Sequence, residues 1–305
     1  MRIFITGGTG FIGRALRQHL LAAGHSLTLI SRQPHPAGKE KGITYLVGDP
    51  AVPGSWQEEL ASHDAVINLA GASIFRLWTS SNQIKIVNSR LHTTANIADA
   101  LIKQPGQCKA LINASAVGYY GFEDKGDTIT EDHARGEDFL AELAERWEEE
   151  AARAATAGIR VARCRFAVVL GPGGGALQQM LPAFRLGLGS ALGTGHQPFP
   201  WIHIEDLCRG ILFLLEHEKL DGPFNFAAPQ AVTNYEFSAE LSRVLSRPIW
   251  LPALPTSLLT LILGEMATLV LHGQKVMPAR LLNSGFHFSY PEIRGALTAI
   301  LGKSS

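Results

Sequence analysis

The residues with the clearest chemical use lie close to the N-terminus, in the run Thr6-Gly7-Gly8-Thr9-Gly10-Phe11-Ile12-Gly13. The run follows the apolar stretch 3–5 and leads into a helical pattern, which is the context of a dinucleotide-binding loop. Glycines let the chain turn tightly and bring backbone N–H groups against phosphate, and a helix that begins near Gly10 directs its positive end there. A plain glycine-rich turn is the alternative. We expect a dinucleotide pyrophosphate at this loop, bound by Gly7, Thr9, Gly10, Phe11, Ile12 and Gly13.

The end of the second expected strand indicates which dinucleotide binds. About 20 residues past the glycines, a strand that prefers NAD usually ends in Asp or Glu, which binds the ribose hydroxyls. Here residues 27–30 are followed by Ser31 and Arg32, and no acidic residue occurs before Glu40. Arg32 can form charge-assisted hydrogen bonds to a 2′-phosphate and Ser31 can donate a hydroxyl to it, whereas a carboxylate would repel it. We therefore expect NADP(H) rather than NAD(H), with a solvated loop cation as the alternative role of Arg32.

The elements that must position these residues alternate between short apolar runs and longer helical patterns. This alternation predicts an α/β fold, a Rossmann doubly wound parallel sheet with a smaller C-terminal substrate lobe. We expect residues 1–170 to form the NADP-binding domain, completed by about 204–230, because the pattern changes to glycine-rich residues after Leu170. Residues 171–203 and 231–305 should then form the small lobe. The expected elements include strands at 66–69, 110–112, 160–164 and 224–226 and helices at 84–102, 139–155 and 204–215.

Composition narrows the partners and the compartment. Of 305 residues, 46% are hydrophobic and 18% charged, and 27 Lys plus Arg balance 27 Asp plus Glu, which favours a small-molecule substrate over nucleic acid. Cys108, Cys164 and Cys208 form no CxxC pair and no ligand set is spaced for a metal, so we expect a reducing cytoplasm and no metal. The apolar residues 258–271 are too short to span a bilayer, so we expect a buried helix or an oligomer contact there and no membrane association.

Further motifs resemble a known family. Asn68-Leu69-Ala70-Gly71 follows the fourth expected strand and Tyr120-Gly121 follows the fifth. Together with the glycine loop, they make nearly the whole chain resemble the extended short-chain dehydrogenase/reductase superfamily, in particular its epimerase-like members. Residues 115–121, 199–203 and 273–276 resemble an atypical subfamily of epimerase-family proteins with a distinctive C-terminal segment. The resemblance implies that the protein binds NAD(P), and homodimers are found among members of this superfamily. It adds Leu69, Ala70 and Gly71 to the expected cofactor-binding residues.

The superfamily uses a Ser or Thr, a Tyr and a Lys, in which a tyrosinate acts as acid or base and the lysine lowers its pKa. The resemblance implies a Tyr and a Lys four residues apart on one helix, but residues 139–148 contain neither. Phe139 and Leu143 occupy the two positions instead. If the alignment is shifted by one residue, Leu140 and Ala144 occupy them. The acidic pair of the dehydratases is absent as well. A sugar dehydratase is therefore not expected, and the main argument for an epimerase is lost.

Other residues could supply the missing groups. Counting back from Tyr120-Gly121 by the family spacing gives Ala116, one place after Ser115, which we still expect to face the nicotinamide. Tyr119 or Tyr120 could provide a phenol at the carboxyl edge of the sheet, with aromatic packing as the alternative. We expect Ser115 and Tyr119 to be the catalytic residues.

Three more features have two interpretations each. Lys85 and Arg90 could reach the cofactor phosphates from the helix at 84–102, or could be solvated charges. His203 could be an acid or base near neutral pH, but it also stands where a helix should begin. Residues 171–175 are expected to form a mobile loop beside the substrate cleft, just downstream of Arg165.

These observations lead to two functional hypotheses. The first is an NADP(H)-dependent oxidoreductase of epimerase-like ancestry that acts on a small carbonyl or hydroxyl compound between the lobes. The second is a sensor that binds NADP(H) without turnover, which the missing Tyr and Lys favour. The polar groups expected in the cleft, Ser115, Tyr119, Tyr120 and Arg90, favour the enzyme.

Overall fold

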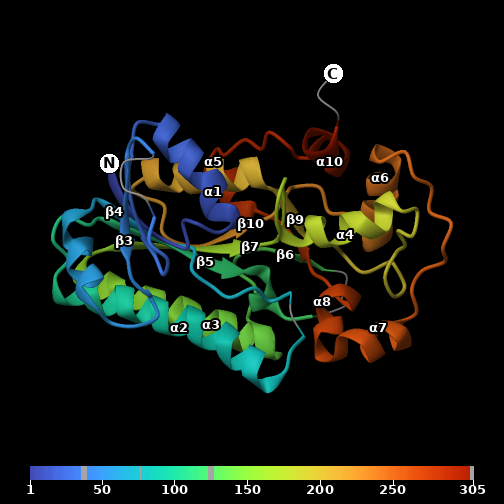
Figure 1. Cartoon of the computed structure of the whole chain (residues 1–305), viewed down its shortest axis with the longest axis horizontal. Coiled ribbons are helices and arrows are strands. Elements are labelled where there is room, and N and C mark those ends of the chain that lie inside the picture. Colours follow the sequence, from blue (N-terminus) through green and yellow to red (C-terminus); the bar gives the residue numbers. More distant parts are fainter. Residues whose placement is uncertain (36–39, 76, 123–126, 303–305) are drawn as a thin grey trace.

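A seven-stranded parallel sheet forms the centre of the protein, seen here in a computed structural model that describes residues 1–35, 40–75, 77–122 and 127–302 (Figure 1). The strand order is β10-β7-β5-β4-β1-β2-β3, so the chain starts in the middle and winds outward in both directions. This confirms the predicted doubly wound sheet. The strands are β1 (Arg2–Thr6), β2 (Ser26–Ser31), β3 (Ile43–Val47), β4 (Ala65–Asn68), β5 (Ala110–Ala116), β7 (Arg160–Phe166) and β10 (Gly222–Phe226).

Helices cover both faces of this sheet. α1 (Phe11–Ala22) and α5 (Ile204–Glu216) lie on one face, and α2 (Ser80–Lys103) and α3 (Phe139–Ala152) lie on the other (Figure 1). Ile3 and Ile5 of β1 pack into the core shared with α1 and α5, whereas Phe4 packs into the core shared with α2. Because successive side chains of a strand point to opposite faces, a strand buried on both sides reads as a continuous apolar run. This is why the strands could be found in the sequence.

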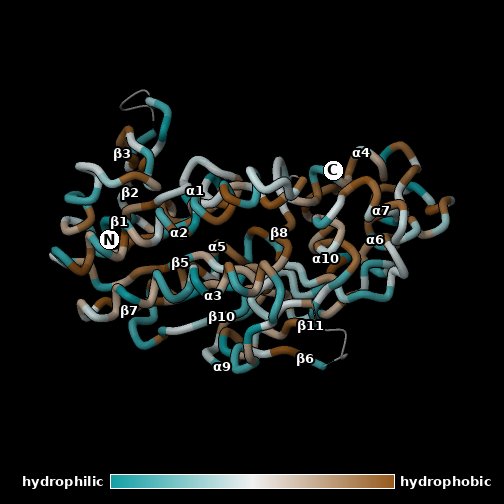
Figure 2. Tube along the Cα trace, turned by 90° about the horizontal axis from the view of Figure 1, so that it is seen from below, coloured by the Kyte–Doolittle hydropathy of each residue, from teal (hydrophilic) through white to brown (hydrophobic). Residues whose placement is uncertain are grey.

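A second core belongs to a group of elements that we call the small lobe. It lies around β8 (Val168–Leu170) and β9 (Trp201–His203), which pair in parallel, and α4 (Gly175–Arg185), α6 (Asn234–Val244) and α10 (Ile293–Leu301) pack there through apolar side chains. Trp201 and Phe237 are both fully buried in this core. Figure 2 shows α4, α6, α7 and α10 gathered at one end of the molecule. The division into two domains stays a prediction.

The C-terminal segment contributes a strand to a separate two-stranded sheet. β11 (Lys275–Val276) pairs in parallel with β6 (Thr128–Ile129), and the buried side chain of Gln274 donates a hydrogen bond to the carbonyl of Gly121. The remaining helices are α7 (Thr256–Leu263), α8 (Thr268–Leu271), α9 (Ala279–Asn283) and the short 3-10 turns η1 (Ser55–Ser62), η2 (Val117–Tyr120), η3 (Arg153–Ala157) and η4 (Gly264–Ala267).

The apolar residues 258–271 do not form one buried helix. Gly264, with a φ of 57°, ends α7 and starts a new turn, because a left-handed conformation interrupts a helix. Of the α7 residues only Leu259 is buried. The expectation of a buried helix is wrong, and that of an oligomer contact stays a prediction. None of the described helices combines the length and the apolar character needed to cross a bilayer.

Candidate cofactor and substrate site

The glycine loop joins β1 to α1 at the carboxyl ends of the strands, where open parallel sheets bind ligands. Gly7 has a φ of 71°, and a Cβ on it would lie 2.6 Å from the carbonyl carbon of Leu69. A Cβ on Gly13 would lie 2.4 Å from the carbonyl oxygen of Gly7. The packing of the chain against itself therefore requires both of these glycines.

Gly10 is different, because the protein crowds it less than Gly7 or Gly13. Its φ of −74° suits any residue, and a Cβ would come close only to the carbonyl oxygen of Gly7, at 3.2 Å. Gly10 precedes the first turn of α1, which has no side-chain cap and no acidic residue. The backbone N–H groups of such a turn form an anion site. A phosphate that approaches the bare backbone explains the glycine, so the loop fits a dinucleotide pyrophosphate.

Phe11 and Ile12 could contribute only their backbone to this site, because their side chains pack against the core below α1. The ring of Phe11 also lies against the second glycine-rich segment, residues 171–175. A Cβ on Gly174 would come within 2.3 Å of the Phe11 ring. Residues 171–175 are therefore packed against the first loop and lead into α4. The ring of Phe11 fills the space beside Gly171, Gly174 and Gly175, whereas the mobility of this loop stays a prediction.

The end of β2 lies beside the glycine loop, since Ile30 pairs with Thr6 in the parallel register. Ser31 is buried, and its hydroxyl oxygen accepts the N–H of Gln33 and lies 3.1 Å from Nε2 of His35. Arg32 is exposed at the tip of this strand. The structure thus brings Ser31 and Arg32 to the place where the ribose of a dinucleotide on this loop would lie.

Arg90 lies beside the Leu69, Ala70 and Gly71 segment. Its Nη1 donates to the carbonyls of Ala72 at 3.0 Å and Ile86 at 3.1 Å, and its guanidinium stacks on Trp147. A Cβ on Gly71 would come within 3.2 Å of the Arg90 guanidinium. Burial lowers the pKa of Arg90 to about 10, and no carboxylate of the described residues pairs with it. Lys85 is exposed on the same helix and has no hydrogen bond to the described residues.

A chain of buried hydrogen bonds supports the loop from below. Thr6 donates to Asn68 Oδ1 at 2.6 Å, and Asn68 Nδ2 donates to Thr94 at 2.8 Å and to Asn113 at 2.7 Å. Trp147 also donates to Thr94. These side chains link β1, β4 and β5 to α2 and α3 at the level of the loop. Thr6 and Asn68 belong to motifs found in the sequence, but their link to Thr94 and Asn113 was missed, because a buried polar residue has no distinctive spacing.

The positions that would carry the family's Tyr and Lys hold apolar side chains, and these side chains pack among other apolar residues. Phe139 meets Trp78 edge to face, with 5.6 Å between the ring centroids. Leu143 packs in the same cluster with Trp147 and Ile86. In the alternative register, Leu140 lies against Gly118 and Ala144 is buried. This wall contains no group that could exchange a proton.

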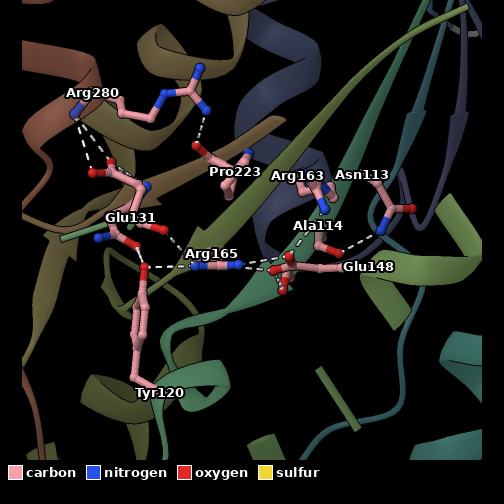
Figure 3. A network of polar contacts seen from close by, with 11 residues as sticks. Asn113, Ala114, Tyr120, Glu131, Glu148, Arg163, Arg165, Pro223 and Arg280 are labelled. Atoms are coloured by element: carbon pink, nitrogen blue, oxygen red, sulfur yellow. Dashed lines mark hydrogen bonds and ion pairs between the residues drawn. The ribbon is translucent and has the colours of Figure 1, made fainter. Parts of the chain in front are cut away.

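Ser115 belongs to a buried ionic network (Figure 3). Its hydroxyl donates to Glu148 Oε1 at 2.7 Å, and Arg165 donates to both oxygens of Glu148, from Nε at 2.7 Å and from Nη2 at 2.9 Å. The three residues are 2–3% exposed. Burial lowers the pKa of Arg165, but the hydrogen bonds and the charge of Glu148 outweigh it and raise that pKa overall. Arg165 therefore stays protonated, and the hydroxyl proton of Ser115 points toward Glu148 in the protein interior.

The two tyrosines after β5 have different surroundings. Tyr120 is buried; its hydroxyl donates to Asn225 Oδ1 at 2.6 Å and accepts from Arg165 Nη1 at 2.8 Å (Figure 3). Burial raises the pKa of Tyr120 to about 12. Tyr119 is half-buried, and the guanidinium carbon of Arg165 lies 3.5 Å from the centre of its ring. Its hydroxyl makes no hydrogen bond to the described residues.

The network continues into the C-terminal segment. The buried carboxylate of Glu131 accepts the backbone N–H of Asn225 at 2.9 Å and that of Arg280 at 3.3 Å (Figure 3). Asn225 Nδ2 in turn donates to the carbonyl of Met277 at 3.0 Å. The residues missed by the sequence analysis, Glu148 and Glu131 above all, looked like ordinary surface charges because each lies among other acidic residues.

His203 caps α5. Its Nδ1 accepts the N–H of Glu205 at 3.1 Å, and its ring packs against Tyr290. Burial lowers the pKa of His203 to about 4. The interpretation as a helix start is confirmed, and the lowered pKa makes the ring a poor proton acceptor near neutral pH.

A hollow of about 510 Å³ lies along the outer face of α1, next to α5 and α10. Its charged groups are largely paired with each other: His19 lies 3.1 Å from Glu205, and Arg17 lies 3.5 Å from Glu40. The hollow is lined by α1, α5 and α10, by His203 at the end of β9 and by Pro172 after β8, and its lining includes none of residues 6–10 of the glycine loop. We therefore place the candidate site at the glycine loop.

Comparison with known proteins gives a consistent picture. A model of the NAD dependent epimerase/dehydratase family matches residues 3–227, and a domain of unknown function, DUF1731, matches residues 254–300. The human epimerase family protein SDR39U1 is 41% identical over 306 residues, covering 99% of this chain and all of that protein. The epimerase family protein YfhF of Bacillus subtilis is 38% identical over 304 residues, covering 99% and 98%. A crystal structure of human SDR39U1 with NADPH superimposes with a TM-score of 0.86 at 38% identity, covering 99% of this chain and all of that one.

Proposed function

Because the chain belongs to the NAD-dependent epimerase/dehydratase family, we propose that it is an NADP(H)-dependent oxidoreductase of epimerase-like ancestry that acts on a small carbonyl or hydroxyl compound. The observation that carries the proposal is Gly10 at the uncapped start of α1, which the protein's own packing crowds less than it crowds Gly7 and Gly13. A phosphate at this position accounts for both features.

The phosphate form of the cofactor is supported by the end of β2. Arg32 is exposed there and Ser31 lies beside it, with no acidic residue to bind the free ribose hydroxyls. The NADPH in the human SDR39U1 structure supports the same choice. Gly7, Thr9, Gly10, Phe11, Ile12 and Gly13 would hold the pyrophosphate through their backbone, and Leu69, Ala70, Gly71 and Arg90 would line the next part of the site.

When bound, NADP(H) supplies or accepts the hydride. The chain's own residues then bind and orient the substrate. Tyr119 is the better placed of the two expected catalytic residues, since its hydroxyl is free of the described residues and can donate to a substrate oxygen. The Ser115 hydroxyl already donates its hydrogen bond to Glu148, so toward a substrate it could only accept one. The apolar wall of Phe139 and Leu143 keeps water away from the reacting atoms.

A second candidate function is an NADP(H)-binding sensor without turnover. Two observations favour it: Phe139 and Leu143 stand where the family's proton-transfer residues would be, and the hydroxyl of Ser115 is committed to Glu148. Tyr119→Phe and Ser115→Ala separate the two functions. If the protein is an enzyme, NADPH oxidation with its substrate falls in at least one of these variants while NADPH binding persists. A sensor would show no oxidation with any carbonyl compound and an unchanged phenotype in both.

The first test is a titration of the protein with NADPH and NADH, followed by nicotinamide fluorescence. Arg32→Asp should weaken NADPH binding by roughly 10- to 100-fold, because one charge-assisted hydrogen bond is lost and a repulsion is added, and should spare NADH. Arg247→Asp, at an exposed position in the small lobe, is the matched control and should bind NADPH normally. Equal binding of NADPH by wild type and Arg32→Asp would remove the assignment of Arg32. Absence of binding of either nucleotide would remove the proposed function.

The proposal includes the setting of the protein. All three cysteines are buried and unpaired, which supports a reducing compartment such as the cytoplasm. We also propose that the protein acts on a small-molecule substrate and forms a homodimer.

A further inference from the structure

Arg90 of α2 has one hydrogen-bonding edge that the described part of the chain does not use. Its Nη1 donates to the carbonyls of Ala72 at 3.0 Å and Ile86 at 3.1 Å. Its Nε and Nη2 donate to none of the described residues, and neither is among the side-chain nitrogens that these residues seal from solvent without a partner. Because Nε and Nη2 lie on one edge of the planar guanidinium, they offer two parallel N–H groups to a ligand.

Gly71 makes room for this guanidinium. A Cβ on Gly71 would lie 3.2 Å from Cζ of Arg90, 3.3 Å from Nη2 and 3.4 Å from Nη1. Since the central carbon would be the nearest of these atoms, Gly71 lies over the flat face of the guanidinium and not at its edge. The φ of Gly71 is not positive, so its backbone conformation does not require glycine. The space that Arg90 needs explains the glycine, and Gly71 leaves the edge with Nε and Nη2 uncovered.

The charge of Arg90 has no counter-charge among the described residues. Burial alone lowers its pKa to about 10, whereas the lowering of the Arg160 pKa by burial is opposed by Glu218 and Asp221. A guanidinium with this pKa still carries its charge at neutral pH. Burying a charge without a partner is costly, and a bound anion would remove this cost.

Arg90 lies on the side of the glycine loop where the nicotinamide would be. The glycine loop follows β1 and Arg32 follows β2, so the phosphorylated adenosine half of NADP(H) would lie over these two strands. The nicotinamide half then extends toward β4 and β5, and Gly71 follows β4. The guanidinium carbon of Arg90 is also 5.1 Å from the centre of the Trp147 ring, and Trp147 is one helical turn after Leu143, where the family's lysine would be.

We propose that Arg90 binds an anionic group of the substrate, a carboxylate or a phosphate, through its Nε and Nη2. The inference rests on the proposed function, because it takes the substrate to lie beside the nicotinamide. It narrows the substrate class to carbonyl or hydroxyl compounds that carry one of these two groups. Parallel N–H groups match the spacing of two oxygens on one carboxylate or phosphate. Nη1 meanwhile stays on the carbonyls of Ala72 and Ile86 and holds the guanidinium in place.

Binding of small anions to the NADPH-saturated protein tests this site without turnover. Isothermal titration calorimetry compares oxamate, which carries a carboxylate, with methyl oxamate, its neutral ester, and with inorganic phosphate. We expect oxamate or phosphate to bind. Methyl oxamate should bind at least about tenfold more weakly than the better of the two anions, because it cannot form charge-assisted hydrogen bonds.

Variants of the site identify Arg90 as the receptor. Arg90→Met should weaken anion binding at least about tenfold and change NADPH affinity less than about threefold. Arg90→Lys keeps the charge without the parallel N–H groups and should show a smaller loss. Gly71→Ala keeps Arg90 but displaces its guanidinium, so it should weaken anion binding even if Arg90→Met disturbs the fold. Lys103→Met removes an exposed cation from the same helix and should bind the anions as the wild type does.

The other outcomes overturn the inference. If neither anion binds to the NADPH-saturated wild type, or if methyl oxamate binds equally well, Arg90 does not select an anionic substrate. If Arg90→Met loses about tenfold or more in NADPH affinity, the partner of Arg90 is a phosphate of the cofactor. NADPH binding is measured first. Its absence would remove the proposed function, whereas NADPH binding without anion binding would remove only this role of Arg90.

Discussion

Ser115 donates its hydroxyl proton to Glu148, across 2.7 Å and between strand β5 and helix α3. The residue that should act on a substrate is thereby turned toward the protein interior. The carboxylate of Glu148 also forms an ion pair with Arg165, and Ser115 adds one further hydrogen bond to that pair.

We expect Ser115→Ala and Glu148→Gln to have very different effects on stability. Ser115→Ala removes one hydrogen bond and leaves the Glu148–Arg165 pair intact, so the free energy of unfolding should fall by about 1 kcal/mol. Glu148→Gln leaves the buried guanidinium of Arg165 without its counter-charge and should lower it by about 3–5 kcal/mol. Urea unfolding measures both. Equal losses in the two variants would contradict the network as described.

Gly10→Ala and Gly13→Ala form a second pair. Gly10→Ala should fold with little loss of stability, since its Cβ meets only the Gly7 oxygen at 3.2 Å, but NADPH affinity should fall at least about tenfold because the methyl group lies where phosphate approaches. Gly13→Ala should destabilise the fold itself, since its Cβ would strike Gly7 at 2.4 Å. Thermal unfolding and fluorescence titration distinguish the two. Normal NADPH binding by a folded Gly10→Ala protein would argue against a phosphate at this turn.

The two tyrosines should also respond differently to loss of the hydroxyl. Tyr120→Phe leaves the partners Arg165 and Asn225 unsatisfied inside the protein, which should cost about 1–3 kcal/mol of stability. Tyr119→Phe removes a hydroxyl without a described partner, so stability should stay within about 0.5 kcal/mol of the wild type. Denaturant unfolding of both variants is the measurement. A Tyr119→Phe protein as unstable as Tyr120→Phe would mean that the Tyr119 hydroxyl has a structural partner and is not free to bind a substrate.

Acid should destabilise the protein in part through His203. Its pKa is lowered from 6.5 to about 4, so the folded state favours the neutral ring, and this stability is complete above pH 6.5 and is lost as the pH falls toward 4. At pH 5 the loss from this residue should be about 2 kcal/mol. His203→Asn keeps a capping oxygen for Glu205 and removes the titration. Its unfolding free energy should fall less between pH 7.5 and pH 5 than that of the wild type, and an identical fall in both proteins would contradict the assignment.

The sheet was predictable because its central strands are buried on both faces. Ile3, Phe4 and Ile5 of β1 are apolar without interruption, and the glycine loop then fixes where α1 begins. The position of the cofactor loop follows from these local signals. A structural feature can be predicted from the local sequence wherever a few adjacent residues determine it.

The partners of Ser115 could not be found in this way. Glu148 comes from another element and lies next to Glu149 and Glu150 in the sequence, so its charge looked solvated. Only the packing of α3 against β5 and β7 decides that it points inward. The same holds for residues 171–175, because only the fold brings the Phe11 ring into the space beside Gly174. Long-range packing sets both outcomes, and it leaves no mark on nearby residues.

Phe11 has a consequence for how the two ends of the molecule communicate. Its backbone begins the turn where the phosphate would bind, while its ring is the surface on which Gly174 and the start of α4 rest. The ring thus couples the start of α4 to the first turn of α1, so a ligand that fixes this turn also restrains the segment around Gly174.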